Sequence, residues 1–117
     1  MRHHHKGRVF GRSHDQREAL LRGLCKSLIM HERISTTEAK AKELRPIIEK
    51  LVTTGRKNTV ANRRLVAAQL GNDDVAVKKL FSAISPRYLD RDGGYTRITK
   101  RSVTATDGRK TAYISFV

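Results

Sequence analysis

The chain has 117 residues and a formal net charge of +14, because 25 lysines and arginines face only 11 acidic residues. This length suits one domain with a modest core, and no apolar run approaches the ~20 residues of a transmembrane helix. So large a positive charge favours a polyanionic partner, of which nucleic acid is the usual one and an anionic membrane surface the alternative. No apolar segment follows the basic N-terminus, so we expect no signal peptide.

Residues 1–12 are predicted to form an extended basic arm, and residues 13–117 a single domain. The arm has no acidic residue and no apolar periodicity, which is typical of a segment without a core of its own. Its histidine run has no second cluster of ligands, so we expect no metal site there. The arm residues expected to contact nucleic acid are Arg2, His3, His4, Lys6, Arg8 and Arg12.

A first helix is predicted to begin after Ser13, which forms a capping-box pair with Gln16, and to end near residue 31. Its core stripe consists of Leu21, Leu24, Cys25 and Leu28. Because Cys25 lies within this stripe, we interpret it as a buried, inert thiol and not as a nucleophile. Residues 33–35 are expected to form a short extended link.

The longest helix is predicted from residues 35–38 through Arg56, with the rest of the chain organised around it. Leu44, Ile47, Ile48, Leu51 and Val52 have helical spacing and share one face. Ser35 and Glu38 fit a capping box, although Thr36 or Thr37 fits the N-cap equally well. Pro46 allows either a helix that ends at Arg45 or a single kinked helix. Because the apolar stripe keeps its phase across the proline, we predict the kinked helix.

Two further helices are predicted in the middle of the chain. The third extends from about Val60 to Leu70, with Gly71 as the C′ residue and a core face made of Ala61, Leu65 and Ala68. The fourth begins at the capping residues 72–74 and is ended by Pro86. Its core stripe is Val77, Leu80, Phe81 and Ile84.

The C-terminal part is predicted to form strands. Residues 87–94 are expected to form a loop, and residues 95–100 and 111–117 two strands, with a turn at Asp107-Gly108. Ala112, Ile114 and Phe116 would share one face, and Ile34 could add a third strand. The fold class is therefore α+β, with about four helices packed on a small two- or three-stranded sheet, plus the basic arm.

Basic residues also mark the domain as a candidate nucleic-acid binder. Between Glu49 and Asp73 the chain has five bases and no acid, which favours phosphate binding over an ordinary solvated face. In the strand at 95–100, outward-facing Tyr95 and Arg97 would offer a stacking plane and a charge, whereas the alternative is that Tyr95 packs on a helix. The candidate contacts in the domain are Arg17, Arg22, Lys40, Arg45, Arg56, Lys57, Arg63, Arg64, Arg87, Arg91, Gly93, Gly94, Tyr95, Arg97 and Lys100.

Sequence motifs of catalysis are missing. The chain has no Gly-rich phosphate loop, no paired-cysteine motif and no His-x-x-x-His pair. Neither His14 nor His31 has an evident nucleophile or carboxylate near it in the sequence. We therefore expect no enzyme activity, no cofactor, no metal and no small-molecule substrate.

Several short segments together resemble one family. They include the Met-Arg-His start, Ala-Leu-Leu-Arg at 19–22, Ser-Leu-Ile at 27–29, His-Glu-Arg-Ile at 31–34, and Thr-Thr at 36–37 with Ala-Lys-Ala-Lys-Glu-Leu-Arg at 39–45. Asn-Arg-Arg-Leu at 62–65, Lys-Leu-Phe at 79–81, Pro-Arg-Tyr at 86–88 and Arg-Asp-Gly-Gly-Tyr-Thr-Arg-Ile at 91–98 complete the set. The whole chain is thus similar to bacterial large-subunit ribosomal protein seventeen.

This resemblance implies a structural role in the large ribosomal subunit in the cytoplasm, with binding to 23S rRNA. It also implies a position on the exit-tunnel side, with protein thirty-two of the same subunit as a neighbour. The chain departs from the family pattern at His4-His5 and at residues 14–17, where individual RNA contacts would differ. The alternative is a small basic DNA- or RNA-binding module outside the ribosome.

Overall fold

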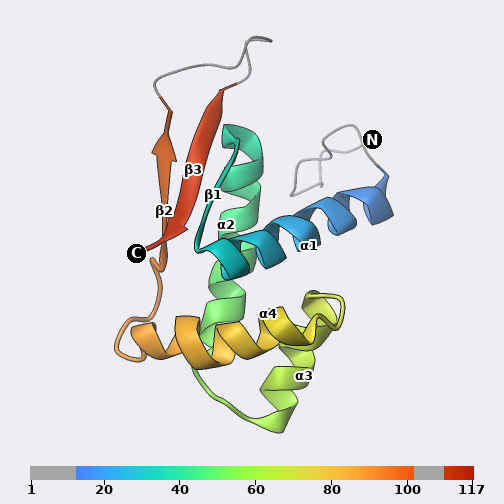
Figure 1. The fold of residues 1–117 in the computed structure, drawn as a ribbon, viewed down its shortest axis with the longest axis vertical. Helices are drawn as coiled ribbons and strands as arrows, with labels where there is room; N and C mark the ends of the chain where they lie inside the picture. Colours follow the sequence, from blue (N-terminus) through green and yellow to red (C-terminus); the bar gives the residue numbers. More distant parts are fainter. Residues whose placement is uncertain (1–12, 102–109) are drawn as a thin grey trace, which may run out of the picture.

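The computed structural model describes residues 13–101 and 110–117 of the chain. The predicted arm and the predicted Asp107-Gly108 turn lie outside these residues. The described elements are α1 (His14–His31), β1 (Arg33–Thr37), α2 (Glu38–Gly55), α3 (Val60–Gln69), α4 (Asp74–Lys79), the π-helical turn η1 (Leu80–Ile84), the 3-10 turn η2 (Ser85–Tyr88), β2 (Thr96–Lys100) and β3 (Thr111–Phe116). This arrangement confirms the predicted α+β class (Figure 1).

Helix α2 is the centre of the fold. The sheet lies along one half of α2, while α4 and its continuation cross the other half beside α3 (Figure 1). Its stripe is buried as predicted, with Leu44, Ile48 and Val52 fully inaccessible. The helix continues through Pro46, so the prediction of a single helix is confirmed over the alternative end at Arg45.

The start of α2 decides between the capping residues that the sequence left open. Ser35 does not cap the helix, because it belongs to strand β1 and pairs there with Tyr113. Thr37 is the N-cap, and its hydroxyl accepts the backbone N–H of Lys40 at 3.2 Å. The hydroxyl residues before Glu38 all suited a cap, and the strand pairing of residues 33–37 decided which one was used.

Helix α1 follows the sequence prediction closely. Ser13 accepts the backbone N–H of Gln16, and the Gln16 side chain accepts the backbone N–H of Ser13, which completes the capping box. Leu21, Cys25 and Leu28 are buried, as predicted. Burial raises the pKa of the Cys25 thiol to about 12, so the thiol is uncharged and inert near neutral pH.

Helix α3 exposes the face that was predicted to be its core. Leu65 is 61% exposed, whereas Val66 and Leu70 are fully buried, so the predicted stripe of Ala61, Leu65 and Ala68 is wrong. Apolar residues occur on two faces of this short helix. Its contacts with α2 and α4 bury the face that carries Val66 and Leu70. Gly71 ends the helix at φ +63, confirming the predicted C′ glycine.

Pro86 does not stop the fourth helix as predicted. The chain passes from α4 into the wider η1 turn, in which the N–H of Ser85 donates to the carbonyl of Leu80, and then into the tighter η2 turn. Proline has no N–H and crowds the preceding turn, and the change of helix type accommodates it without ending the winding. Arg87 and Tyr88 are therefore helical and not part of a loop.

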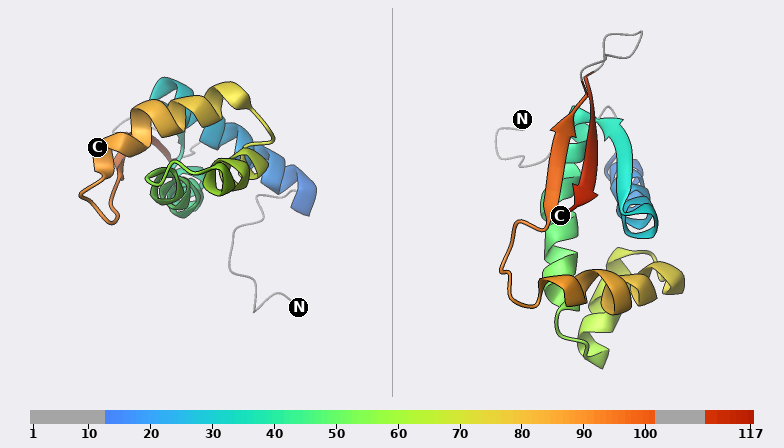
Figure 2. Two further views of the ribbon diagram at one scale, coloured as in Figure 1. Left: turned by 90° about the horizontal axis from the view of Figure 1, so that it is seen from below. Right: turned by 60° about the vertical axis from the view of Figure 1, so that its left-hand side comes forward.

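The sheet is antiparallel with the order β1-β3-β2, so the expected third strand near Ile34 is present. One face packs on α2, and β3 contributes buried Ala112 and Ile114 to it, as its alternation predicts. Phe116 packs against the same core. The right-hand view in Figure 2 shows α2 on one side of the sheet and no described helix on the other side.

Candidate nucleic-acid interface

Five of the candidate basic residues lie beside carboxylates. Arg17 pairs with Glu43, Arg45 with Glu49, Arg56 with Asp92, Arg87 with Glu32 and Lys100 with Glu38. The hydrogen bond from Arg87, followed by its charge and that of Lys79, holds the pKa of the Glu32 carboxyl below its usual range. A neighbouring carboxylate offsets part of the charge of each of these five bases, which weakens their attraction for phosphate.

Arg56 shows how such a base serves the fold. Its guanidinium donates to the carbonyls of Leu89 and Arg91 at 3.1 and 2.8 Å and to the Tyr95 hydroxyl at 3.2 Å. It also lies 3.3 Å from Asp92. These bonds attach the segment between η2 and β2 to the end of α2, so Arg56 holds this segment in place.

Glu49 attaches the other end of this segment to α2. One carboxylate oxygen accepts the N–H of Gly94 at 3.1 Å, and the other accepts the N–H and hydroxyl of Thr96 at 3.2 and 2.8 Å. Gly94 has φ +65, a conformation that glycine adopts without strain. Neither Gly93 nor Gly94 has an atom within 4 Å of the position that a Cβ would take, so neither is needed for close packing within the described chain.

The prediction that Tyr95 faces outward beside Arg97 is wrong. Tyr95 is fully buried, packs against Tyr88 at 5.1 Å between ring centroids, and hydrogen-bonds Thr53 through its hydroxyl at 3.0 Å. The strand alternation begins only at Thr96, and the turn at Gly94 directs Tyr95 inward. Arg97 is exposed, as predicted.

The remaining candidates differ in whether their side chains already have a partner within the described chain. Arg22 donates to the carbonyl of Gln69 and Arg91 to that of Gly94. Within the described residues, no carboxylate or hydrogen-bond partner is present for the side chains of Lys40, Lys57, Arg63, Arg64 and Arg97. The arm candidates Arg2, His3, His4, Lys6, Arg8 and Arg12 lie outside the described residues.

Three of these five bases lie where α2 passes into α3. Lys57, Arg63 and Arg64 are all exposed there. Arg63 and Lys78 line a shallow hollow of about 150 Å³ with Asn58. No acidic side chain lines this hollow, so its two basic side chains favour the binding of an anion.

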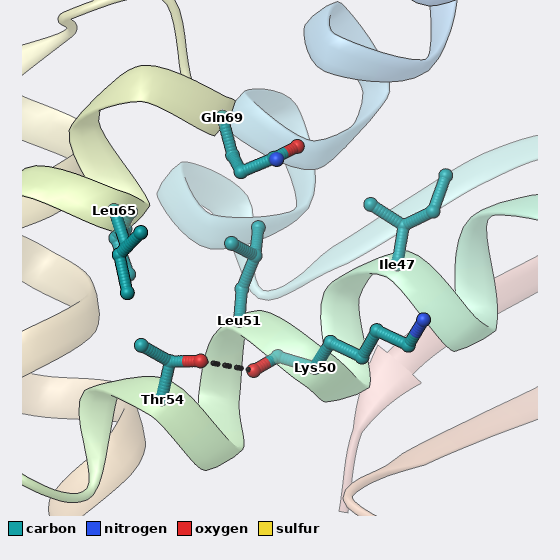
Figure 3. A pocket seen from close by; sticks show the side chains of 7 residues that line it. Ile47, Lys50, Leu51, Thr54, Leu65 and Gln69 are labelled. Atoms are coloured by element: carbon teal, nitrogen blue, oxygen red, sulfur yellow. Dashed lines mark hydrogen bonds between the residues drawn. The ribbon is translucent and has the colours of Figure 1, made fainter. Parts of the chain in front are cut away.

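A second hollow of about 380 Å³ lies between α2 and α3 (Figure 3). Its floor is apolar, formed by Ile47, Leu51, Leu65 and Val66, and Lys50 lies along its edge. This position explains why Leu65 is exposed although it is large and apolar. Lys50 is the one base that lines this apolar hollow, and no carboxylate lines it.

Sequence reasoning missed three residues on the far side of the molecule. Arg33 and Arg101 both lie over the ring of Tyr113, at 3.9 and 5.2 Å from guanidinium carbon to ring centroid. The alternation of side chains along β1 and β3, and past the end of β2, directs all three outward. Only the order of the strands shows that Arg33 and Arg101 both meet Tyr113.

Other kinds of site find no support among residues 13–101 and 110–117. No group of histidine, cysteine or acidic side chains there is arranged to hold a metal ion. No described helix has both the length and the apolar character to cross a membrane.

Comparison with known proteins gives one consistent result. Residues 20–117 match the family model described as ribosomal protein L17. A protein of Thermomicrobium roseum named large ribosomal subunit protein bL17 is 51% identical over 117 residues, which cover all of this chain and 99% of the relative. A protein of the same name from Mesorhizobium japonicum is 50% identical over the whole chain and 81% of its own length, and one from Staphylococcus carnosus is 47% identical over 94% of the chain and 98% of its own length.

Proposed function

We propose that this chain, which belongs to the ribosomal protein L17 family and is a structural constituent of the large ribosomal subunit and not an enzyme, binds 23S rRNA through its uncompensated basic residues. As a constituent of the bacterial ribosome it works in the cytoplasm. The observation that carries the proposal is the division of the bases into two groups. One group lies beside carboxylates, and the other has no acidic partner among the described residues. Three members of the second group, Lys57, Arg63 and Arg64, lie on α3 or just before it.

The exposed bases of α3 are suited to phosphate for two reasons. Arg63 and Arg64 are adjacent on one short helix, so they can approach neighbouring phosphates of one backbone. The second reason is the position of α3. The Asn62 amide donates to the carbonyls of Thr54 and Lys57, and these bonds fix the start of α3 against the end of α2. The backbone that carries the two arginines is thereby fixed before RNA binds, which lowers the entropic cost of binding.

The test measures the affinity of the purified chain for 23S rRNA over a range of salt concentrations. If about 6–10 phosphates are neutralised, the plot of log K against log salt has a slope several units negative. The double variant Arg63→Gln/Arg64→Gln should bind more weakly and make this slope less negative by roughly one to two units.

The matched control is Lys42→Gln/Lys79→Gln, which also removes two positive charges from helices. Lys42 lies beside Glu38 and Lys79 beside Glu32, carboxylates that they share with Lys100 and Arg87, so each of these charges is compensated in part. The control should change affinity much less than the α3 variant. Equal losses from both variants would show that only total charge matters and would contradict a defined α3 contact.

The arm forms a second part of the proposal, supported by its composition. Residues 1–12 contain Arg2, Lys6, Arg8 and Arg12 and no acidic residue. Deleting residues 2–11 should weaken binding to 23S rRNA and leave the melting temperature of the free chain almost unchanged. A large fall in melting temperature would show that the arm belongs to the core, against the proposal.

Neighbouring proteins form the third part. The resemblance of the sequence supports contact with other large-subunit proteins, and with protein thirty-two in particular. Cross-linking of assembled subunits followed by mass spectrometry tests this contact. Cross-links from described lysines of this chain to protein thirty-two would support it, whereas cross-links only to other proteins would refute that choice of neighbour.

A further inference from the structure

The sheet has an open face that none of the described helices covers. Helix α2 packs on the opposite face, as the right-hand view in Figure 2 shows. Strand alternation sets the residues of the open face, and the register brings them into rows. These residues are Arg33 and Ser35 of β1, Thr111, Tyr113 and Ser115 of β3, Arg97 and Thr99 of β2, and Arg101, whose backbone N–H donates to Thr111.

The chemistry of this face is uniform. Its described residues carry three guanidinium groups, several hydroxyls and one aromatic ring, and no carboxylate. Arg33 and Arg97 flank Ser115 from the two edge strands, with Cα atoms about 10 Å apart by the usual strand spacing. All three arginines are exposed, and none forms an ion pair within the described chain.

Tyr113 fixes the positions of two of these arginines. The guanidinium carbon of Arg33 lies 3.9 Å from its ring centroid and that of Arg101 5.2 Å. Arg101 also donates to the hydroxyl of Ser35 at 3.3 Å, across the sheet. Arg33 forms no side-chain hydrogen bond within the described residues, and Arg101 forms only the one to Ser35, so both guanidinium groups keep N–H groups that can bind a further acceptor.

The ligand that fits these groups is a phosphate. Guanidinium forks bind phosphate oxygens with two parallel hydrogen bonds, and serine and threonine hydroxyls add further donors. An apolar protein surface would find few partners here, because Tyr113 is the one large apolar side chain that the strands β1, β2 and β3 place on this face. A base stacked on Tyr113 would have to displace the arginines that already contact the ring.

We propose that the open sheet face is a second RNA-binding surface, at which Arg33, Arg97 and Arg101 bind phosphates of an RNA backbone and Tyr113 positions the arginines. This inference rests on the proposed function, since it assigns a second surface to the same RNA partner. The face lies on the side of the sheet away from α2, whereas the α3 contact lies at the far end of α2. The chain would therefore bridge two RNA segments.

The experiment compares three variants of the full chain in binding to 23S rRNA. Arg33→Gln/Arg97→Gln/Arg101→Gln should weaken binding and make the salt slope less negative by about two to three units. Tyr113→Leu should weaken binding about three- to tenfold with almost no change in slope, because it disturbs the arginines without removing a charge. Tyr113→Phe keeps the ring and should bind like the parent.

Three results would overturn this inference. If the triple variant binds 23S rRNA like the parent, the face makes no RNA contact. If it binds RNA normally but no longer joins the large subunit, the face contacts a protein. If Tyr113→Phe is as weak as Tyr113→Leu, the hydroxyl matters and the positioning role of the ring is wrong.

The test separates this inference from the proposed function. A parent chain that does not bind 23S rRNA would refute the proposed function itself. A parent that binds with a steep salt slope, together with sheet variants that bind equally well, would refute only the second surface. Circular dichroism and thermal melting of each variant exclude misfolding as the cause of weaker binding.

Discussion

The contact between α2 and the η2 turn leads to a sharp prediction about Gly55. This glycine ends α2 against buried Ser85, whose hydroxyl donates to the carbonyl of Val52 at 3.0 Å. A Cβ added at Gly55 would overlap the Ser85 hydroxyl oxygen and lie 3.2 Å from the Cβ of Ser85. Gly55→Ala should therefore destabilise the chain, even though alanine is the better helix former.

The magnitude follows from two opposing terms. Overpacking a closely packed contact costs roughly 1–3 kcal/mol. Replacing glycine by alanine inside a helix gains up to about 1 kcal/mol, and less at a helix end. We therefore expect Gly55→Ala to lower the free energy of unfolding by about 1–2 kcal/mol. Gly23 in α1 has no neighbouring atom within 4 Å of an added Cβ, so Gly23→Ala should stabilise the chain by up to about 1 kcal/mol.

Urea denaturation followed by circular dichroism measures both changes. The double variant Gly55→Ala/Ser85→Ala removes the overlapping hydroxyl and should lose less stability than the sum of the single variants. If Gly55→Ala proves as stable as Gly23→Ala, the reasoning about this contact is refuted. Additive losses in the double variant would show that Ser85 is not the group that resists the added methyl.

Three other predictions concern single side chains. Cys25, with its raised pKa and burial, should react with iodoacetamide only after denaturation; rapid labelling of the native chain would contradict its burial. The pKa of Glu32 is lower in the folded chain than in the unfolded chain, so its carboxylate stabilises the fold at pH values above the unfolded pKa. This stabilisation is lost as the pH falls through the folded pKa. Glu32→Gln should therefore flatten the fall of melting temperature below about pH 5, and an unchanged pH profile would disprove the link to Arg87. Glu49→Gln should lower the free energy of unfolding in urea by about 1–3 kcal/mol, since the carboxylate accepts three hydrogen bonds. The control Glu18→Gln, at an exposed position, should change it little. Equal stability of the two variants would contradict the role of Glu49 in holding the segment at Gly94 and Thr96.

Local sequence signals predicted most of the fold. The capping box at Ser13 and the stripe from Leu44 to Val52 are properties of one helix each, and the structure confirms them. The alternation in β3 likewise identified Ala112 and Ile114 as buried. In each case the residues that decide the structure are neighbours in sequence, so periodicity and capping chemistry were sufficient.

The errors arose where distant residues decide the structure. Tyr95 faces inward because Arg56 and Thr53, about 40 positions earlier, bind its hydroxyl. Helix α3 buries Val66 and not Leu65 because of its contacts with other elements. Local spacing allowed both phases, so the sequence alone could not choose between them.

The candidate interface was predictable as a property of the whole chain and not residue by residue. Net charge indicated a polyanionic partner. However, Arg87 pairs with Glu32, 55 positions away, whereas Arg63 pairs with no described acidic residue. This distinction depends on tertiary contacts. The same is true of Arg33 and Arg101, which meet at Tyr113 only because β3 lies between β1 and β2.

Sedimentation of ribosomes tests the central claim most directly. Subunits are separated at low magnesium on gradients of increasing salt, and the chain is followed by an antibody or an epitope tag. We predict that it migrates with the large subunit through moderate salt and leaves only under conditions that strip proteins from rRNA. A chain that remains at the top of the gradient at physiological salt, or migrates with the small subunit, would contradict the account.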